Sequence, residues 1–296
     1  MQYHFEQVDV FTKKRFAGNP LAVFTEAQGL SPEDMQRVAR EMNLSETTFV
    51  VPSTIPDCVA RYIIFTPDDE MPFAGHPTVG TAYVLARLGK VPSGSNTLNL
   101  EAKVGKVAVR VEGPSNNPTA LFFTSPPIVF GSRCDNRAAV ADALGLRESD
   151  LLATAPVEEA GCPVLHPYVG LASPELVDSV TVNEKLFVKA MNEPKTTGVY
   201  IFASKHETQG IYARFFSFTK GGTIEDPATG SAASPLAAYL LRHGLLAEGN
   251  EFVVEQGTKM GRQSFLTVSL TRRGRSADKI EVGGSAVSVL SGTLVM

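Results

Sequence analysis

The sequence has no tryptophan, few cysteines and few histidines, and these shortages limit the chemistry open to the protein. Cys58, Cys134 and Cys162 are the three cysteines among 296 residues. Because their number is odd and no Cys-x-x-Cys pair occurs, they imply neither a disulfide framework nor a zinc site. The five histidines do not approach the spacing of metal ligands either. We therefore expect no metal centre.

The sequence also lacks an excess of charge and a long apolar run. Its 27 basic and 31 acidic residues leave a net charge of −4. This balance gives no electrostatic footprint for nucleic acid, and no basic run indicates an anionic membrane surface. No apolar run approaches the roughly 20 residues needed to cross a bilayer, and the first residues lack the pattern of a secretory signal. These absences predict a soluble, cytoplasmic protein.

Several catalytic motifs are missing as well. The sequence contains no Gly-x-Gly-x-x-Gly fingerprint, no Walker P-loop, no Gly-x-Ser-x-Gly elbow and no His-Glu-x-x-His pair. A nucleotide-binding enzyme or a hydrolase is therefore not expected.

What the sequence does contain is an internal repeat. The segment from Glu70 to Gly89 matches, without a gap, the segment that starts 155 positions later at Glu225. Two copies are too few and too distant for a solenoid, which stacks at least three short repeats. They fit two half-domains built alike, with one site between them. The coinciding pairs are Glu70/Glu225, Pro72/Pro227, Gly75/Gly230, Leu85/Leu240, Arg87/Arg242 and Gly89/Gly244.

Each repeated segment is predicted to contain a buried helix. Residues 79–88 and 232–241 are apolar almost all round and rich in small residues, which is typical of a buried helix. Proline follows His76 in the first copy, Ser231 is a candidate N-cap in the second, and both copies end at glycine. We therefore predict an α+β protein of two pseudo-symmetric domains, each a curved mixed β-sheet or barrel around a central helix.

The length of 296 residues fits two domains of about 150 residues each. Serine and two prolines at 125–127 mark the expected boundary. The predicted domains are residues 1–125 and residues 126–296, with the option that the closing strand, residues 286–296, returns to the first domain.

Other elements follow from local patterns. Ser31 before Pro32 and two acidic residues predicts a helix that runs to about Asn43, and Ser173 begins a similar pattern. Residues 17–20 are predicted to be a turn. Strands are predicted at 21–24, 49–51, 59–65, 98–102, 106–111, 199–202, 213–216, 266–270 and 286–296.

The starts of the two repeated helices are candidates for an anion site. Each start presents unpaired backbone N–H groups and about half a positive charge, so a substrate carboxylate or a developing enolate is a fitting guest. Two starts placed symmetrically are able to face each other across a cleft between the domains. Ordinary capped helix ends explain the same pattern, and from the helices alone both explanations stay open.

Four side chains are candidate acids, bases or ligands. His76 has an ordinary pKa that makes it usable near neutral pH, although a single histidine is more often structural. Asp226 lies in the second copy, where aspartate also suits a turn. Ser231 taken alone is explained by helix capping. Glu46 precedes an apolar strand, where desolvation is expected to raise its pKa toward the range that a general acid or base needs.

Four motifs in this order characterise the chain further. They are Gly18-Asn19-Pro20-Leu21-Ala22-Val23-Phe24, Glu41-Met42-Asn43-Leu44-Ser45-Glu46-Thr47-Thr48-Phe49-Val50, Phe65-Thr66-Pro67 with Glu70-Met71-Pro72-Phe73-Ala74-Gly75-His76-Pro77, and Glu225-Asp226-Pro227-Ala228-Thr229-Gly230-Ser231-Ala232. With these motifs the chain resembles the phenazine-biosynthesis isomerase family (PhzF-like), whose fold is that of diaminopimelate epimerase. The resemblance runs nearly from end to end and includes a C-terminal pattern around Glu255-Gln256-Gly257.

The resemblance implies a cofactor-independent isomerase that acts on a small carboxylate in the cleft between the two halves. Glu46 matches the family glutamate that moves a proton between carbon atoms. His76 and Asp226 match the assisting residues, and Ser231 matches the family serine. The substrate of the best-known member is dihydro-hydroxyanthranilic acid, and family members often form homodimers, so a homodimer is expected.

The resemblance also assigns two glycines to substrate binding. Gly75 and Gly230 fall where backbone N–H groups of the family meet the ligand.

One departure from the wider superfamily bears on the mechanism. Its cysteine-dependent epimerases and racemases carry two thiols at positions that match Ala74 and Thr229 here. Without that pair, inversion at one carbon lacks its acid and base, so a single carboxylate that removes and returns a proton fits better. The three cysteines are expected to lie away from both helix starts and to be dispensable.

Two alternatives stay open. One is an amino-acid epimerase or racemase that does not depend on cysteine, and the other is a non-catalytic binding protein for small molecules. The combination of Glu46, His76 and Asp226 weighs against the second, because binding alone needs no general base.

Overall fold

In the computed structural model, the chain divides into two compact units. Unit 1 consists of residues 1–126 and 281–296, and unit 2 consists of residues 127–280. The structure describes the whole chain except for residues 194–195, 206–209 and 247–248.

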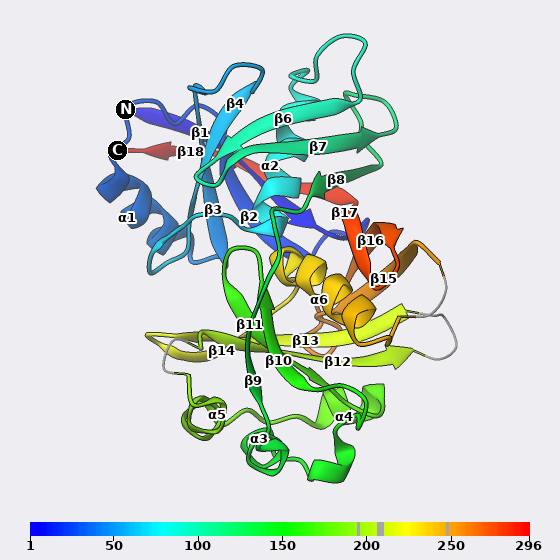
Figure 1. The fold of residues 1–296 in the computed structure, drawn as a ribbon. Helices are drawn as coiled ribbons and strands as arrows, with labels where there is room; N and C mark the ends of the chain where they lie inside the picture. Colours follow the sequence, from blue (N-terminus) through cyan, green and yellow to red (C-terminus); the bar gives the residue numbers. More distant parts are fainter. Residues whose placement is uncertain (194–195, 206–209, 247–248) are drawn as a thin grey trace. The chain divides into compact units, whose positions relative to one another are not determined.

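Unit 1 is a mixed β-sheet that closes on itself. Its strands are β1 (Gln2–Val10), β2 (Asn19–Phe24), β3 (Glu46–Val51), β4 (Ala60–Phe65), β5 (Glu70–Met71), β6 (Thr97–Ala102), β7 (Gly105–Glu112), β8 (Ala120–Thr124), the end of β17 (Ser276–Gly284) and β18 (Ala286–Val295). Pairing runs in the order β18, β1, β2, β3, β4, β6, β7, β8 and β17. Because β17 leads almost directly into β18, the two ends of this order are one stretch of chain. The antiparallel β1 and β18 bring the two termini together (Figure 1).

The helix inside this sheet is α2 (Gly75–Arg87), the first repeated segment. All its residues from Gly75 to Ala86 are buried, as the all-round apolar pattern predicts. It packs against β1, β2, β3, β6, β7, β8 and β18. A Cβ added to Gly80 would lie 2.6 Å from Leu21 Cδ2 and 2.9 Å from Val10 Cγ2, so glycine is what allows β1 and β2 to approach the helix.

The helix α1 (Pro32–Met42) covers the outside of the same sheet. Ser31 Oγ accepts the N–H of Asp34 at 3.1 Å, and Asn43 ends the helix in the left-handed conformation with φ 50°. Both ends confirm the prediction from the capping pattern. The buried side chains of α1 complete a hydrophobic cluster whose strand members include Phe24, Phe49 and Phe65.

Unit 2 places helices on both faces of its sheet. Its strands are β9 (Val129–Cys134), β10 (Val157–Gly161), β11 (Leu165–Gly170), β12 (Gly198–Lys205), β13 (Gly210–Thr219), β14 (Gly222–Asp226), β15 (Glu251–Gln256) and β16 (Ser264–Arg273). The second repeated helix, α6 (Gly230–Arg242), packs against β10 and β16. The helices α3 (Arg137–Ala143), α4 (Pro174–Ser179) and α5 (Glu184–Met191) share a hydrophobic cluster with the opposite face.

The two units repeat one topology. In unit 1, β2 is parallel to β3, β3 is antiparallel to β4, and β4 pairs with both β5 and the parallel β6. In unit 2, β11, β12, β13, β14 and β15 pair in the same way. The repeated helix follows β5 in one unit and β14 in the other. The prediction of an α+β protein with two pseudo-symmetric halves is therefore confirmed.

The start of α6 differs from the prediction in detail. Its N-cap is Thr229, and Ser231 is the second residue of the helix, so Ser231 is wrong as the N-cap. The Thr229 N–H is bound to Gln256 Oε1 at 3.2 Å, and this distant partner fixes Thr229 as the residue before the helix. The predicted turn at 17–20 is also too long, because Asn19 and Pro20 already belong to β2.

Candidate active site

In unit 1, the structure brings two of the predicted residues together. Glu46 is the first residue of β3, and His76 is the second residue of α2. Glu46 Oε2 lies 3.4 Å from His76 Nε2, and the two side chains are 17% and 4% exposed. A carboxyl group and an imidazole thus meet where the sheet strand and the central helix both begin.

Asn19 holds the imidazole ring from its other side. The side-chain Nδ2 of Asn19 lies 3.1 Å from His76 Nδ1, and both residues are buried. This contact fixes the ring orientation and leaves Nε2 directed at Glu46. A ring oriented in this way needs no reorganisation to act on a group placed beside Glu46.

Burial also sets the charge of His76. It lowers the pKa of the imidazole from 6.5 to about 3, and a hydrogen bond with the Pro20 carbonyl opposes this only in part. The expectation that His76 titrates near neutral pH is therefore wrong, because the ring is enclosed by protein. At pH 7 the contact with Glu46 joins a neutral imidazole to a carboxyl group and is not an ion pair, in spite of its short distance.

The start of α2 receives no cap from the side chain of its N-cap residue. Its N-cap is Ala74, which makes no side-chain hydrogen bond to the first turn, and no acidic residue lies in that turn. Gly75 and His76 are both buried. The first-turn N–H groups and the positive end of the helix dipole are thus available to an anion.

In unit 2, Asp226 is held in a network of short polar contacts. Thr229 Oγ1 donates to Asp226 Oδ2 at 2.5 Å. Gln256 Nε2 donates to the backbone oxygen of Asp226 at 2.8 Å and to Thr229 Oγ1 at 3.0 Å. Tyr200 donates its hydroxyl to Gln256 Oε1 at 3.2 Å. The carboxyl group of Asp226 therefore has a defined position next to the start of α6.

The start of α6 resembles the start of α2. The side chain of its N-cap residue makes no capping hydrogen bond, and no acidic residue lies in its first turn. Gly230 is buried and Ser231 is partly exposed. The N-caps are Ala74 and Thr229, so neither N-cap position carries a thiol here.

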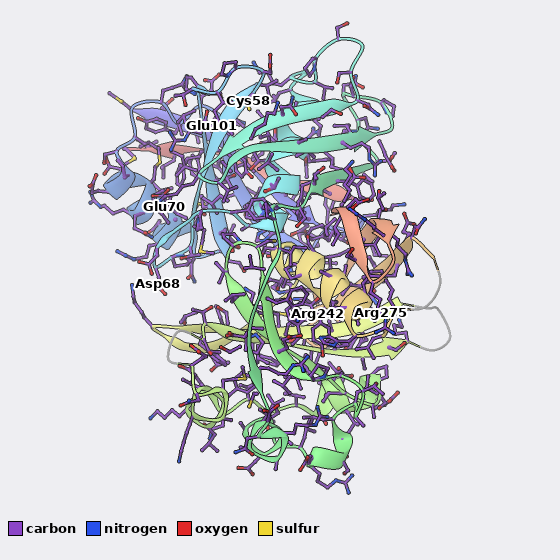
Figure 2. The ribbon with its side chains drawn as sticks, viewed as in Figure 1. Cys58, Asp68, Glu70, Glu101, Arg242 and Arg275 are labelled. Atoms are coloured by element: carbon purple, nitrogen blue, oxygen red, sulfur yellow. The ribbon has the colours of Figure 1, made fainter. Side chains whose placement is uncertain are left out.

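One cysteine is not where it was expected. Cys162, which is buried, directs Sγ at the Ser231 carbonyl of α6 at 3.5 Å. Cys134 instead donates to the Ala190 carbonyl at 3.1 Å, and Cys58 lies near Glu101 in unit 1 (Figure 2). The expectation that all three thiols lie away from the helix starts is wrong for Cys162.

The sequence patterns assign no role to three residues of these clusters. Asn19 lies in the Gly-Asn-Pro motif, which is typical of a turn, and Gln256 lies in the C-terminal Glu-Gln-Gly pattern. Thr229 enters the sequence analysis only as the place of an absent thiol. Each lies within a motif that carries the family resemblance, and that was the signal that could have identified it.

Among the described residues, no group of three or more His, Cys, Asp and Glu side chains is placed to hold a metal ion. Within the same part of the chain, no helix is both long and apolar enough to span a membrane.

The fold defines the class of protein. The structure of a hydroxyproline epimerase from Agrobacterium vitis covers 99% of this chain and 92% of its own, with a TM-score of 0.69 at 14% identity. A Bacillus anthracis phenazine biosynthesis protein of the PhzF family covers 100% of both chains, with a TM-score of 0.87 at 26% identity. The chain has the diaminopimelate-epimerase-like fold of these enzymes.

The sequence comparison identifies the family within that class. Residues 8–292 match the family described as phenazine biosynthesis-like protein (PhzC-PhzF), and the chain belongs to this family. The trans-2,3-dihydro-3-hydroxyanthranilate isomerase of Pseudomonas chlororaphis is 34% identical over 99% of this chain and 100% of its own length. The enzyme of the same name from Pseudomonas aeruginosa is 33% identical over 98% of both. The chain is thus an isomerase of the PhzF type.

Proposed function

We propose that this isomerase works without a cofactor and moves a proton between two carbon atoms of a small carboxylate, with Glu46 as the proton carrier. The observation that carries the proposal is the contact between Glu46 and His76 at 3.4 Å. The imidazole is neutral at pH 7, so it adds no positive charge that would weaken the carboxylate as a base. General acid–base catalysis of this kind contributes about 10²–10⁴-fold to a rate.

The proposed reaction has two proton transfers. Glu46 takes a proton from one carbon, so a C–H bond breaks, an O–H bond forms and the electron pair passes into an enolate-type system. Glu46 then returns the proton to a second carbon. Backbone N–H groups at Gly75 and Gly230 would stabilise the negative charge between the two steps.

We further propose that Asp226 and Ser231 contact the same substrate from unit 2, across a cleft between the two halves. The repeated topology supports this, since each half carries an uncapped helix start. Asp226 is fixed beside that start by Thr229 and Gln256, which suits a group that positions the substrate or relays a proton.

The substrate to test first is trans-2,3-dihydro-3-hydroxyanthranilate. It is named for relatives that match this chain over 98–100% of their own length at 33–34% identity. It carries a carboxylate for an uncapped helix start, together with an amine and a hydroxyl group.

The test is turnover of this compound by purified protein, followed by absorbance and NMR. Glu46→Gln keeps the shape of the side chain and loses its basic oxygen, so we expect turnover to fall by about 10²–10⁴-fold. Glu41→Gln is the matched control, because Glu41 is an exposed glutamate on α1. Unchanged turnover by Glu46→Gln would contradict the role of Glu46.

A further inference from the structure

A second buried histidine lies in unit 2, where the mechanism above assigns it no role. His166 on β11 is 9% exposed. Its Nδ1 is enclosed and has no hydrogen-bond partner among the described residues. Its neighbour in the structure is an aromatic ring, Phe215, at 4.8 Å between ring centroids. A buried polar atom without a partner destabilises the folded protein, so a partner from outside the chain is worth seeking.

The pattern of β11 shows which way His166 points. Val169 and Leu171 belong to the hydrophobic cluster on the α3–α5 side of the sheet. Because side chains alternate along a strand, His166 and Tyr168 point to the opposite side, toward α6. Tyr168 shows this directly, since its hydroxyl donates to the Ala232 carbonyl in the first turn of α6 at 2.7 Å.

The strand register places His166 at the starting end of α6. Tyr239, in the last turn of the helix, donates its hydroxyl to the Pro156 carbonyl just before β10. From there β10 runs toward the start of the helix, and its Ala160 pairs with His166. His166 therefore lies beyond Tyr168 in the direction of the helix start.

The repeated topology leads to the same place. Strand pairing matches Val199 of β12 with Thr47 of β3. Gly198, one residue earlier, therefore corresponds to Glu46. In unit 1, Glu46 pairs with Leu21 on the neighbouring strand. In unit 2, the register between β11 and β12, extended by two residues, places His166 opposite Gly198. His166 thus occupies the position next to the counterpart of Glu46. The matched pairs are Glu70/Glu225, Phe65/Phe216 and Thr47/Val199.

On the side of the sheet that faces α6, the strands next to β11 add further aromatic and polar side chains. A Cβ on Gly198 would lie 2.9 Å from Phe215 Cζ, so the absence of a side chain makes room for the Phe215 ring. Phe215 pairs with Asp226 on the next strand. His166 and Asp226 therefore lie on either side of Phe215, next to the start of α6.

We propose that His166 is a substrate-binding residue, whose ring nitrogen forms a hydrogen bond with a hydroxyl or amino group of the substrate while the ring of Phe215 packs against the carbon skeleton. This inference rests on the proposed function and deepens it. A neutral imidazole offers one donor and one acceptor, and burial lowers the pKa of His166 to about 4. The residue therefore favours a neutral polar substituent and would determine specificity among small cyclic carboxylates.

The experiment is calorimetric titration of three probes that differ by one group at a time: benzoate, anthranilate and 3-hydroxyanthranilate. Wild-type protein is expected to bind one of the substituted probes about 10-fold more tightly than the probe that lacks the group, as one added hydrogen bond provides. His166→Phe should abolish this ratio while it still binds benzoate. If the variant loses the difference in affinity between benzoate and anthranilate, His166 contacts the amino group. If it loses the difference between anthranilate and 3-hydroxyanthranilate, His166 contacts the hydroxyl group.

Tyr168→Phe is the matched control. It removes a polar group from the same face of β11, but the partner of that group is the internal Ala232 carbonyl. It should change the affinity for all three probes equally. His166→Leu is a second apolar variant, read in the same way if His166→Phe does not fold.

The outcomes separate this inference from the proposed function. If the wild type binds the probes and the apolar His166 variants keep the ratio, the role of His166 is refuted and the proposed function stands. If the wild type binds none of the three probes, the proposed class of substrate is refuted and the role of His166 with it.

Discussion

At the scale of single residues, two histidines are neutral because protein surrounds them. Burial lowers the pKa of His76 to about 3 and that of His166 to about 4. In the unfolded chain both rings titrate near 6.5. Each ring therefore binds a proton more readily when the protein is unfolded.

This difference predicts acid sensitivity. The contribution of His76 to stability is fully present above pH 6.5 and is lost as the pH falls from 6.5 toward about 3. At pH 5 the loss amounts to about 2 kcal/mol for this residue. Urea unfolding of wild-type protein and of His76→Gln at pH 7.5 and pH 5 measures it. The variant should lose about 2 kcal/mol less than the wild type between the two pH values, and an equal loss in both proteins would contradict the assignment.

The sequence predicted part of this residue-level arrangement. Glu46 and His76 were assigned to one site by their motifs, and the structure brings them to 3.4 Å. The charge of His76 was not predictable, because it depends on burial in the folded chain beside Asn19 and Pro20 of β2. Asn19 was missed for a similar reason: Gly-Asn-Pro is typical of a turn, whereas Asn19 here begins a buried strand.

At the scale of secondary structure, α6 contains an internal proline that another element compensates. Pro235 has no N–H to donate to the carbonyl four residues earlier, which is that of Ser231. Cys162 directs its thiol at that carbonyl at 3.5 Å. The cysteine near the helix start is therefore explained by satisfaction of a partly buried backbone oxygen, and it needs no part in catalysis.

This explanation predicts coupling between the two residues. Cys162→Ala should destabilise the protein by about 1 kcal/mol, because a partly buried carbonyl loses its donor. In a Pro235→Ala background the restored N–H binds the same carbonyl, so Cys162→Ala should cost less. A double-mutant cycle from urea unfolding measures the coupling. Additive effects would show that the thiol does not serve this carbonyl, and loss of turnover in a folded Cys162→Ala variant would show a catalytic role instead.

Local patterns predicted some elements and not others. The helix α1 was predictable from its cap and its apolar stripe. Strand β10 was not predicted, because two of its five residues are the acidic Glu158 and Glu159. Glu158 is buried there, and its carboxylate pairs with three residues that are distant in the sequence. They are Arg133, His243 and Arg242, the last on α6 (Figure 2). Partners so far apart in the sequence leave no local signal.

At the scale of the whole molecule, the repeat was the strongest signal in the sequence. A gap-free match over a spacing of 155 residues predicted two halves with the same fold, and the two units share the same order of strand pairing. The closure of unit 1 by β17 and β18 depends on pairing between opposite ends of the chain. Local patterns predicted the closing strand, but they left open the domain to which it belongs.

The two halves nevertheless differ in their chemistry. Unit 1 contributes the carboxyl and imidazole pair of Glu46 and His76, whereas Gly198 stands at the place of Glu46 in unit 2. Duplicated acid–base pairs would suit inversion at one carbon, as in an epimerase. A single acid–base pair in unit 1, without a counterpart in unit 2, suits movement of a proton from one carbon to another.

Solvent deuterium tests this central claim most directly. The reaction of trans-2,3-dihydro-3-hydroxyanthranilate is run in D₂O with wild-type protein and with Glu46→Gln, and NMR locates the label. Because the protonated Glu46 carboxyl group exchanges its proton with D₂O between the two transfers, the proposed mechanism predicts that deuterium enters the carbon that receives the proton in the isomerised product, and that the variant incorporates it about 10²–10⁴-fold more slowly. Deuterium found only at a carbon of inverted configuration, or incorporated by Glu46→Gln at the wild-type rate, would contradict it.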